Sequence, residues 1–197
     1  MTTPEGESVK EQLFEAARVL IGKMGYAELS HADLTAEVGI GRTTFYEHFT
    51  SKEDLLVQMV VRDLPSLVAE IVDSVDPALP ADERLGALAL GLVEFVGTDH
   101  IGLILHTDVP HLSDEAQANI AEAHTGLSLA FASTYRDGVE TGLFRTVPPR
   151  LAGRMMEQMI MTGGKAVMQS DDPIADVAEI AELTSEMVVA AFRIQGT

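Results

Sequence analysis

The chain is 197 residues long and carries a formal net charge of −18 at pH 7, with 46% hydrophobic residues and no cysteine. This length can hold one ordinary domain and a small one, and the hydrophobic content is ample for a core. The missing cysteines exclude disulfides, thiolate redox sensing and cysteine-ligated metal, and the net charge has the wrong sign for binding a polyanion through overall charge.

The hydrophobic pattern is helical along nearly the whole chain. Val9, Leu13 and Leu20 recur at helical spacing and predict a first helix over residues 8–24, which Gly25 ends. No repeat, low-complexity tract or strand-like alternation is evident further along. We therefore predict an all-α protein.

Two short helices joined by a turn are predicted next. Ser30 is placed to cap the first of them, and Gly39 supplies the positive φ that a sharp turn between helices needs. In the second, residues 42–49, Phe45 and Phe49 share one side and polar residues occupy the other. This is the layout of a helix-turn-helix, whose second helix lies in the major groove of DNA.

The remaining two thirds of the chain continue as helices. Ser51 with Asp54 resembles a capping box for a fourth helix, which Pro65 should kink or end. Residues 73–82, with two prolines, are predicted to be a connecting loop. Further helices are predicted at residues 82–96, 116–139, 149–170 and 173–194.

Short motifs in the first third of the chain follow one another at fixed spacing. They are Phe14-Glu15-Ala16-Ala17, Gly25-Tyr26, Val38-Gly39-Ile40, Thr44-Phe45-Tyr46-Glu47-His48-Phe49 and Ser51-Lys52-Glu53-Asp54-Leu55. The series resembles the TetR family of bacterial transcriptional regulators, and residues 138–145 resemble the family's turn between its last long helices. Gly41 stands where the family usually has a capping serine. The resemblance implies an N-terminal three-helix helix-turn-helix domain, residues 1–55, and a C-terminal helical bundle for ligand binding and dimerisation, residues 56–197.

The polar side of the predicted recognition helix supplies the candidate DNA contacts. Arg42 and Thr43 open the helix, where an arginine can bind a guanine through two hydrogen bonds. Thr44 can offer its hydroxyl to phosphate or its methyl group to thymine. The family resemblance assigns Tyr46 and Lys52 to backbone phosphate. The full set of candidate DNA-binding residues is Arg42, Thr43, Thr44, Tyr46, His48 and Lys52.

The charge of the N-terminal region bears on this assignment. Residues 1–62 hold six basic and ten acidic side chains, a net charge of −4, whereas residues 42–52 alone have a net charge of +1. Helix N-termini also offer backbone N–H groups to phosphate without formal charge. We therefore expect specific, salt-sensitive DNA binding with little non-specific affinity.

The C-terminal part is expected to hold a small organic effector. Helical bundles bind ligands between facing helices, in mostly apolar cavities with few polar groups. The candidate lining residues are Phe95, His106, Phe131, Tyr135, Met156 and Met159. Core packing explains each phenylalanine and methionine as well as a pocket does, so both interpretations stay open. The acidic balance favours a neutral or cationic effector.

Apolar stripes on the last two predicted helices suit a four-helix bundle across a two-fold axis. The stripes are Leu151, Met155, Met159, Thr162 and Ala166 on one helix, and Val177, Ile180, Thr184, Met187, Val188 and Ala191 on the other. Packing within the subunit is the alternative explanation. We expect a homodimer through these two helices.

Metal binding and catalysis have little support. Asp99, His100, Asp108 and His111 offer ligands that suit zinc or nickel, but their spacing matches no tight ligand motif, so we predict no metal site. No phosphate-binding glycine loop is present, and no nucleophile with its base can be placed by spacing, so we predict that the chain is not an enzyme and has no cofactor.

The predicted function is that of a regulator which represses transcription. The homodimer would bind a palindromic operator on double-stranded DNA until a small effector releases it. The alternative is a small-molecule-binding dimer with weak or lost DNA binding. The N-terminus has no basic start or apolar run, and the longest apolar stretch, residues 85–96, is too short to span a bilayer. We expect a cytoplasmic protein without membrane contact.

Overall fold

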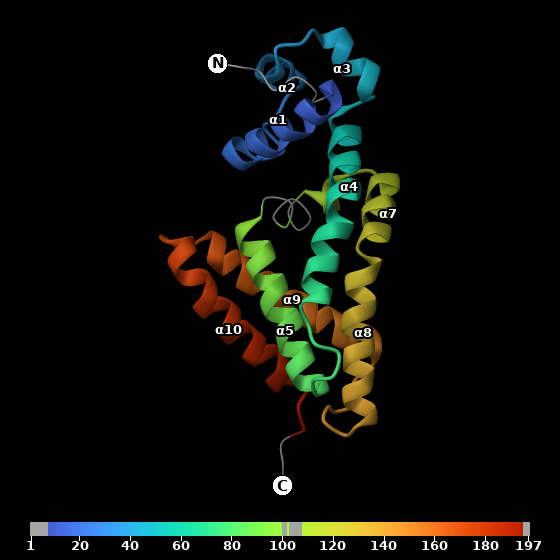
Figure 1. Cartoon of the computed structure of the whole chain (residues 1–197), viewed down its shortest axis with the longest axis vertical. Coiled ribbons are helices and arrows are strands. Elements are labelled where there is room, and N and C mark those ends of the chain that lie inside the picture. The colour runs from blue at the N-terminus through green and yellow to red at the C-terminus, as the bar shows by residue number, and fades with distance from the viewer. Residues whose placement is uncertain (1–7, 100–101, 103–107, 195–197) are drawn as a thin grey trace. The chain divides into compact units, whose positions relative to one another are not determined.

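The computed structural model describes residues 8–99, 102 and 108–194. Over this part of the chain the fold is helical, with one isolated β-bridge between Phe144 and Arg193, so the predicted all-α class is confirmed. The helices are α1 Val9–Met24, α2 His31–Val38, α3 Arg42–His48, α4 Lys52–Asp73, α5 Ala81–Thr98, the short 3₁₀ helix η1 Val109–His111, α7 Asp114–Ala123, α8 Thr125–Glu140, α9 Pro149–Met168 and α10 Pro173–Phe192 (Figure 1). None of the helices described is long and apolar enough to cross a membrane.

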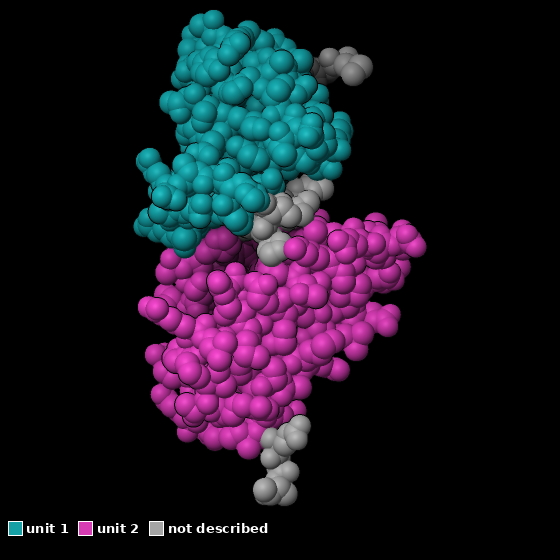
Figure 2. Space-filling view, turned by 180° about the vertical axis from the view of Figure 1, so that it is seen from behind, with its two compact units in different colours: residues 1–63, 104–122 teal, residues 64–103, 123–197 magenta. Residues whose placement is uncertain are grey.

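The chain divides into two compact units (Figure 2). The first comprises Met1–Asp63 and Ile104–Glu122, and the second comprises Leu64–Leu103 and Ala123–Thr197. The first unit therefore extends past residue 55 and takes in a segment from the middle of the chain. The predicted division of function at residue 55 is a separate question and stays a prediction.

Local signals explain the ends of the first helices. Ser30 and Asp33 form the capping box of α2, in which the Ser30 hydroxyl accepts from the Asp33 N–H and the Asp33 carboxylate accepts from the Ser30 N–H at 2.9 Å. Gly39 follows α2 with a φ of 76°, the left-handed conformation that the turn requires. Gly41 precedes α3 and gives it no side-chain cap.

The core of the first unit explains how α3 is held. Phe45 and Phe49 are buried, and the Phe49 ring meets the Phe14 ring of α1 edge-to-face at 5.3 Å between centroids. Leu34 from α2 and Leu55 from the first turn of α4 are also buried. The predicted apolar side of the recognition helix is therefore confirmed.

The expected end of a helix at Pro65, one of the two effects predicted there, and one predicted helix over residues 116–139 were wrong. Pro65 does not end α4, which continues to Asp73, because buried Leu64 and Val68 on either side keep the helix packed. The long helix predicted over residues 116–139 is two helices, α7 and α8, which meet at His124. Thr125 and Gly126, both weak helix formers, follow this junction.

The second unit is a bundle in which α5, α9 and α10 pack against one another and α8 packs on α5 and α9. Its core is built from aliphatic side chains such as Leu85, Val93, Ile160 and Val188. Gly163 on α9 allows the close approach of α10, since a Cβ atom there would stand 2.5 Å from the Thr184 hydroxyl.

Candidate nucleic-acid interface

The helix α3, predicted to be the recognition helix, presents a polar face because Phe45 and the C-cap residue Phe49 are anchored in the core. Arg42, Thr43, Tyr46 and His48 are exposed, and Thr44 is half-buried. These five predicted DNA-binding residues therefore lie together on one short helix. The sixth, Lys52, opens α4 and has different surroundings.

Arg42 and Tyr46 interact along one side of α3. The Arg42 guanidinium donates a hydrogen bond of 3.3 Å to the Tyr46 hydroxyl and lies 5.5 Å from the centre of the Tyr46 ring. Residues four apart on a helix are neighbours, so this contact follows directly from their spacing. The tyrosine, 43% exposed, thus touches both the arginine and the surface that α3 presents.

His31 lies behind this pair and was not predicted. It is the first residue of α2, and its ring stacks on Tyr46 at 5.6 Å between centroids and an angle of 29°. It meets the Phe45 ring edge-to-face at 4.9 Å. Its Nε2 atom is buried and has no hydrogen-bond partner. Burial, and then the positive charges of Arg42 and Lys52, lower the pKa of His31 below its usual value.

Lys52 holds the turn between α1 and α2. Its ammonium group donates to the carbonyl oxygens of Tyr26 at 2.9 Å and Leu29 at 2.8 Å, with that of Ala27 at 3.4 Å, and lies 4.3 Å from the centre of the Tyr26 ring. An ammonium group has three hydrogens to donate, and these carbonyls supply three acceptors. Contact of Lys52 with phosphate stays a prediction. The hydrogen bonds of its ammonium group also give Lys52 a structural role.

Glu53, the next residue, also makes contacts within the first unit. Its carboxylate accepts from the Ser113 N–H at 3.1 Å and the Ser113 hydroxyl at 2.6 Å, at the start of α7. Burial, followed by the negative charges of Glu53 and Asp108, raises the pKa of Tyr26 to about 12. The start of α4 therefore ties the α1–α2 turn and α7 together within the first unit.

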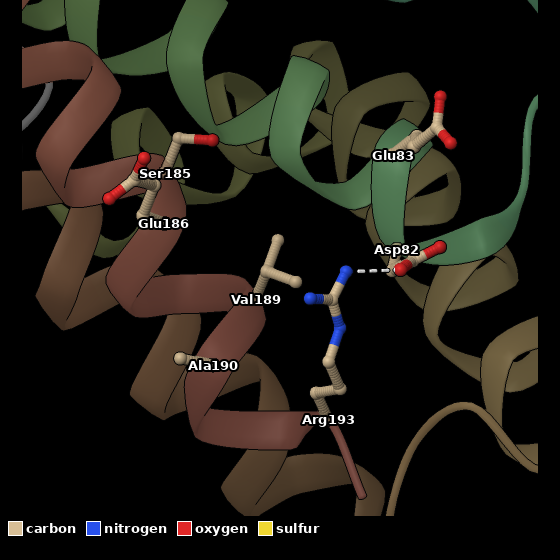
Figure 3. A pocket seen from close by; sticks show the side chains of 7 residues that line it. All are labelled: Asp82, Glu83, Ser185, Glu186, Val189, Ala190 and Arg193. Atoms are coloured by element: carbon tan, nitrogen blue, oxygen red, sulfur yellow. Dashed lines mark hydrogen bonds and ion pairs between the residues drawn. The ribbon is translucent and has the colours of Figure 1, made fainter. Parts of the chain in front are cut away.

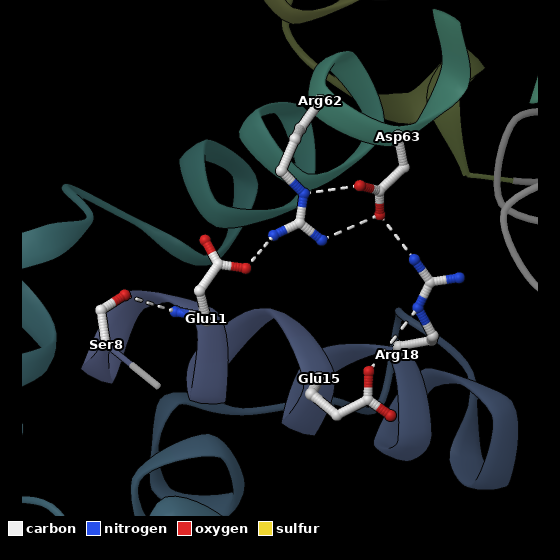
Figure 4. A network of polar contacts seen from close by, with 6 residues as sticks. All are labelled: Ser8, Glu11, Glu15, Arg18, Arg62 and Asp63. Atoms are coloured by element: carbon white, nitrogen blue, oxygen red, sulfur yellow. Dashed lines mark hydrogen bonds and ion pairs between the residues drawn. The ribbon is translucent and has the colours of Figure 1, made fainter. Parts of the chain in front are cut away.

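Two of the six basic residues in the N-terminal region are paired with acidic side chains (Figure 4). Arg62 binds Asp63 and Glu11, each at 2.5 Å, and Arg18 binds Asp63 at 2.5 Å. The hydrogen bond to Asp63 is the main cause that raises the pKa of Arg62. These two arginines join α1 to α4, so their charge is largely balanced within the protein.

The structure brings together only some of the residues predicted to line a ligand pocket. Phe95 on α5 and Phe131 on α8 are half-buried, while Met156 on α9 is buried and Met159 is half-buried. Tyr135 on α8 is also buried, but it belongs to a cluster of aromatic rings. The centre of its ring lies 6.1 Å from that of Phe144 and 5.4 Å from that of Phe192. Its hydroxyl donates to the Arg145 carbonyl at 2.9 Å and accepts from the Val147 N–H at 2.8 Å. His106 lies outside the described residues.

A hollow of about 520 Å³ does occur in the second unit, between α5 and α10 (Figure 3). It is lined by Asp82, Glu83, Ser185, Glu186, Val189, Ala190 and Arg193, none of which was predicted to bind a ligand. Arg193 is paired with Asp82, and the Ser185 hydroxyl donates to the Gly86 carbonyl at 2.8 Å. Its polar groups are therefore partly satisfied within the protein.

No cluster of three or more histidine, aspartate or glutamate side chains that could hold a metal occurs among the described residues. Asp108 and His111 lie within this part of the chain, whereas His100 lies outside it.

The outer faces of α9 and α10 differ in charge but share exposed apolar residues. Leu151 and Met155 on α9 are exposed, as are Leu183 and Met187 on α10, with Met187 60% exposed. Thr184 and Val188, which we expected at a dimer interface, are buried within the subunit against α5 and α9. The exposed charges are Arg150, Arg154, Glu157 and Lys165 on α9, and Glu179, Glu182 and Glu186 on α10.

Comparisons with known proteins agree with this arrangement. Residues 13–59 match the family model "Bacterial regulatory proteins, tetR family", and residues 78–162 match "Tetracyclin repressor-like, C-terminal domain". The HTH-type transcriptional regulator TtgR of Pseudomonas putida is 28% identical over 148 residues, which cover 70% of each chain. A structure of AibR in complex with isovaleryl coenzyme A and operator DNA is similar, with a TM-score of 0.75 at 20% identity, covering 92% of this chain and 98% of that one. A structure of FadR from Bacillus subtilis in complex with stearoyl-CoA has a TM-score of 0.70 at 20% identity, and the match covers 88% of this chain and 96% of that one.

Proposed function

The chain belongs to the TetR family of bacterial regulatory proteins, and we propose that it is a repressor which binds a palindromic operator as a homodimer. The family consists of transcriptional regulators and not of enzymes. The observation that carries the proposal is the polar face of α3, held outward by two buried phenylalanines. A helix presented in this way suits the major groove.

The residues of α3 take distinct roles in this proposal. Arg42 and Thr43 read base edges, since they open the helix and are exposed. Tyr46 contacts phosphate, which sets the position of α3 without reading sequence, whereas Thr44 and His48 reach either phosphate or a base edge. Lys52 supports α3 from behind by fixing the α1–α2 turn.

A two-fold dimer would place two copies of α3 in successive turns of the major groove, roughly 34–36 Å apart. The exposed apolar residues of α9 and α10 support this dimer, because they lack cover within the subunit. Charge supports it as well. In a four-helix bundle, α9 of one subunit can pack against α10 of the other, where basic and acidic faces are complementary.

We further propose a small organic effector that binds in the second unit, near Phe95, Phe131, Met156 and Met159, and releases the operator. These side chains come from three helices that pack together, the usual setting of a pocket in a helical bundle. Acyl-CoA molecules are the first class to screen, because AibR and FadR hold them. Their phosphates are anionic, so this class departs from the neutral or cationic effector that the acidic balance of the chain favours, and neutral and cationic molecules are screened beside it. A regulator that meets its operator in this way is expected in the cytoplasm.

The proposal is tested by fluorescence anisotropy on duplexes that flank the protein's own gene, at low and moderate salt. Arg42→Ala should weaken specific binding by roughly 1–3 kcal/mol and relax one operator position. Arg136→Ala is the matched control, because it removes the same charge from an exposed site on α8. If Arg42→Ala and Arg136→Ala both bind with wild-type affinity and sequence preference, the assigned reading face is wrong.

The charge balance favours one second candidate. Residues 1–62 have a net charge of −4, and Arg18 and Arg62 are already paired with acidic side chains. A dimer that binds a small molecule but has weak or lost DNA binding would have this balance. The dependence on salt separates the two functions, since log K for B-DNA falls with log salt by about 0.9 for each phosphate contacted. A flat response would favour the second candidate.

A further inference from the structure

His31, Tyr46 and Arg42 form a continuous stack that begins in the core of the first unit and ends at the surface of α3. We propose that His31 is a positioning residue for DNA reading: its ring supports Tyr46 and, through the Tyr46 hydroxyl, sets the direction in which Arg42 leaves the helix. The inference rests on the proposed operator binding and adds to it a residue outside the recognition helix.

The inner end of the stack is rigid. His31 directly follows Ser30, whose hydroxyl and N–H are both engaged by Asp33 in the capping box of α2. Its ring is held on one side by Phe45, which is fully buried, at 4.9 Å and a nearly perpendicular angle of 87°. The imidazole therefore has a fixed place from which it can support a neighbour.

The outer end of the stack is exposed. Tyr46 is 43% exposed and has the His31 ring against its plane, so the histidine limits the positions that the tyrosine can adopt. The Tyr46 hydroxyl in turn accepts the hydrogen bond from Arg42. An exposed arginine otherwise samples many rotamers, and fixing it on DNA costs conformational entropy. Holding Arg42 before DNA arrives lowers that cost.

The unpaired Nε2 atom of His31 supports a role beyond packing. A buried polar atom without a partner is destabilising, and a phenylalanine in its place would avoid that cost. Arg42 and Lys52 also stand close enough to lower the pKa of this imidazole. The charge state of His31 therefore reports whether Arg42 is beside it, which gives a measurement that does not need DNA.

The first experiment titrates the histidines of the full-length protein by NMR, with His31→Phe used to identify the His31 signal. The His31 midpoint should lie below 6.5 in the wild type and rise in Arg42→Gln, because a nearby positive charge is removed. Arg136→Gln serves as the control, in which the His31 midpoint should not move. An ordinary His31 midpoint, or one that is the same in wild type and Arg42→Gln, would overturn the stack.

The second experiment measures binding to an operator duplex and to a scrambled duplex. His31→Ala should weaken operator binding by roughly two- to tenfold, the factor for losing the pre-organisation of one long side chain, and leave scrambled binding unchanged. His31→Phe should rescue the operator preference, since it keeps the ring. In an Arg42→Ala background, His31→Ala should have no further effect.

These outcomes separate the two proposals. If the wild type binds no duplex, operator binding fails, and the NMR titration alone judges the stack. The inference fails, and the histidine is structural, in two cases. In the first, the wild type binds but His31→Ala weakens binding to the operator and the scrambled duplex equally. In the second, His31→Ala still weakens operator binding in the Arg42→Ala background. Thermal melting of each variant shows whether a loss of binding reflects loss of the fold.

Discussion

At the scale of single residues, Lys52 shows how a cation predicted to contact DNA can serve the fold. It was predicted from the family resemblance to contact phosphate, yet its ammonium group faces backbone carbonyls of the α1–α2 turn, including those of Tyr26 and Leu29. Tyr26 and Leu29 lie in the turn between α1 and α2, and α2 begins shortly after it at His31. Lys52 therefore holds the segment from which α2 starts.

We predict that Lys52→Met lowers the free energy of unfolding by roughly 1–3 kcal/mol, because partly buried carbonyls lose a charged donor while the apolar stem is kept. Urea denaturation measures this, with Lys165→Met as a control at an exposed site of the second unit. If Lys52→Met is as stable as the control but binds every duplex more weakly, Lys52 is a phosphate contact and its hold on the turn is unimportant.

Residue contacts differ in how far they could be predicted. The buried side of α3 was predictable, because Phe45 and Phe49 are four residues apart and the evidence lies within one helix. The roles of His31 and Lys52 were not, since their partners come from other helices. Tyr135 shows the same limit, because its hydroxyl binds Arg145 and Val147 beyond the end of α8.

At the scale of elements, α4 and α7 of the first unit are joined through the serine that caps α7. α7 begins after Ser113, whose hydroxyl accepts from the Ala116 N–H at 3.3 Å. That same serine donates to Glu53 of α4, sixty residues earlier. The prediction of a single helix over residues 116–139 was wrong, because the helical periodicity of the sequence continues across the junction at His124 and gives no sign of the break.

We predict that Ser113→Ala lowers the free energy of unfolding by about 1 kcal/mol, the usual effect of losing an N-cap. Glu53→Gln should also destabilise, and the double variant should be less affected than the sum of the two, because they share one contact. Urea denaturation of the four proteins completes the cycle, and Ser128→Ala on α8 is the control. Additive effects would show that Glu53 and Ser113 act separately.

At the scale of the whole molecule, charge is distributed unevenly, with consequences for assembly. The chain has a net charge of −18, yet the exposed face of α9 carries Arg150 and Arg154. The facing helix in a bundle should therefore be acidic, and α10 has that character. Sequence periodicity predicted stripes on both helices but could not tell Met187, which is exposed, from Val188, which is buried, because that depends on how the bundle packs.

We predict that reversing either charged face abolishes the homodimer and that mixing the two reversed chains restores it. The first chain carries Arg150→Glu with Arg154→Glu, and the second carries Glu182→Arg with Glu186→Arg. Each chain alone sets like charges against each other across the two-fold axis, which costs association energy. In a mixed dimer, the acidic α9 of the first chain would meet the basic α10 of the second, and the basic α9 of the second would meet the acidic α10 of the first.

Light scattering should then give the 21.2 kDa chain mass for each reversed protein and twice that mass for an equimolar mixture and for the wild type. Arg136→Glu on α8 controls for the change in net charge and should stay dimeric. Reversed chains that remain dimeric alone would place the interface elsewhere. A mixture that stays monomeric would show that the two reversed faces do not meet across the axis, and it would overturn this arrangement.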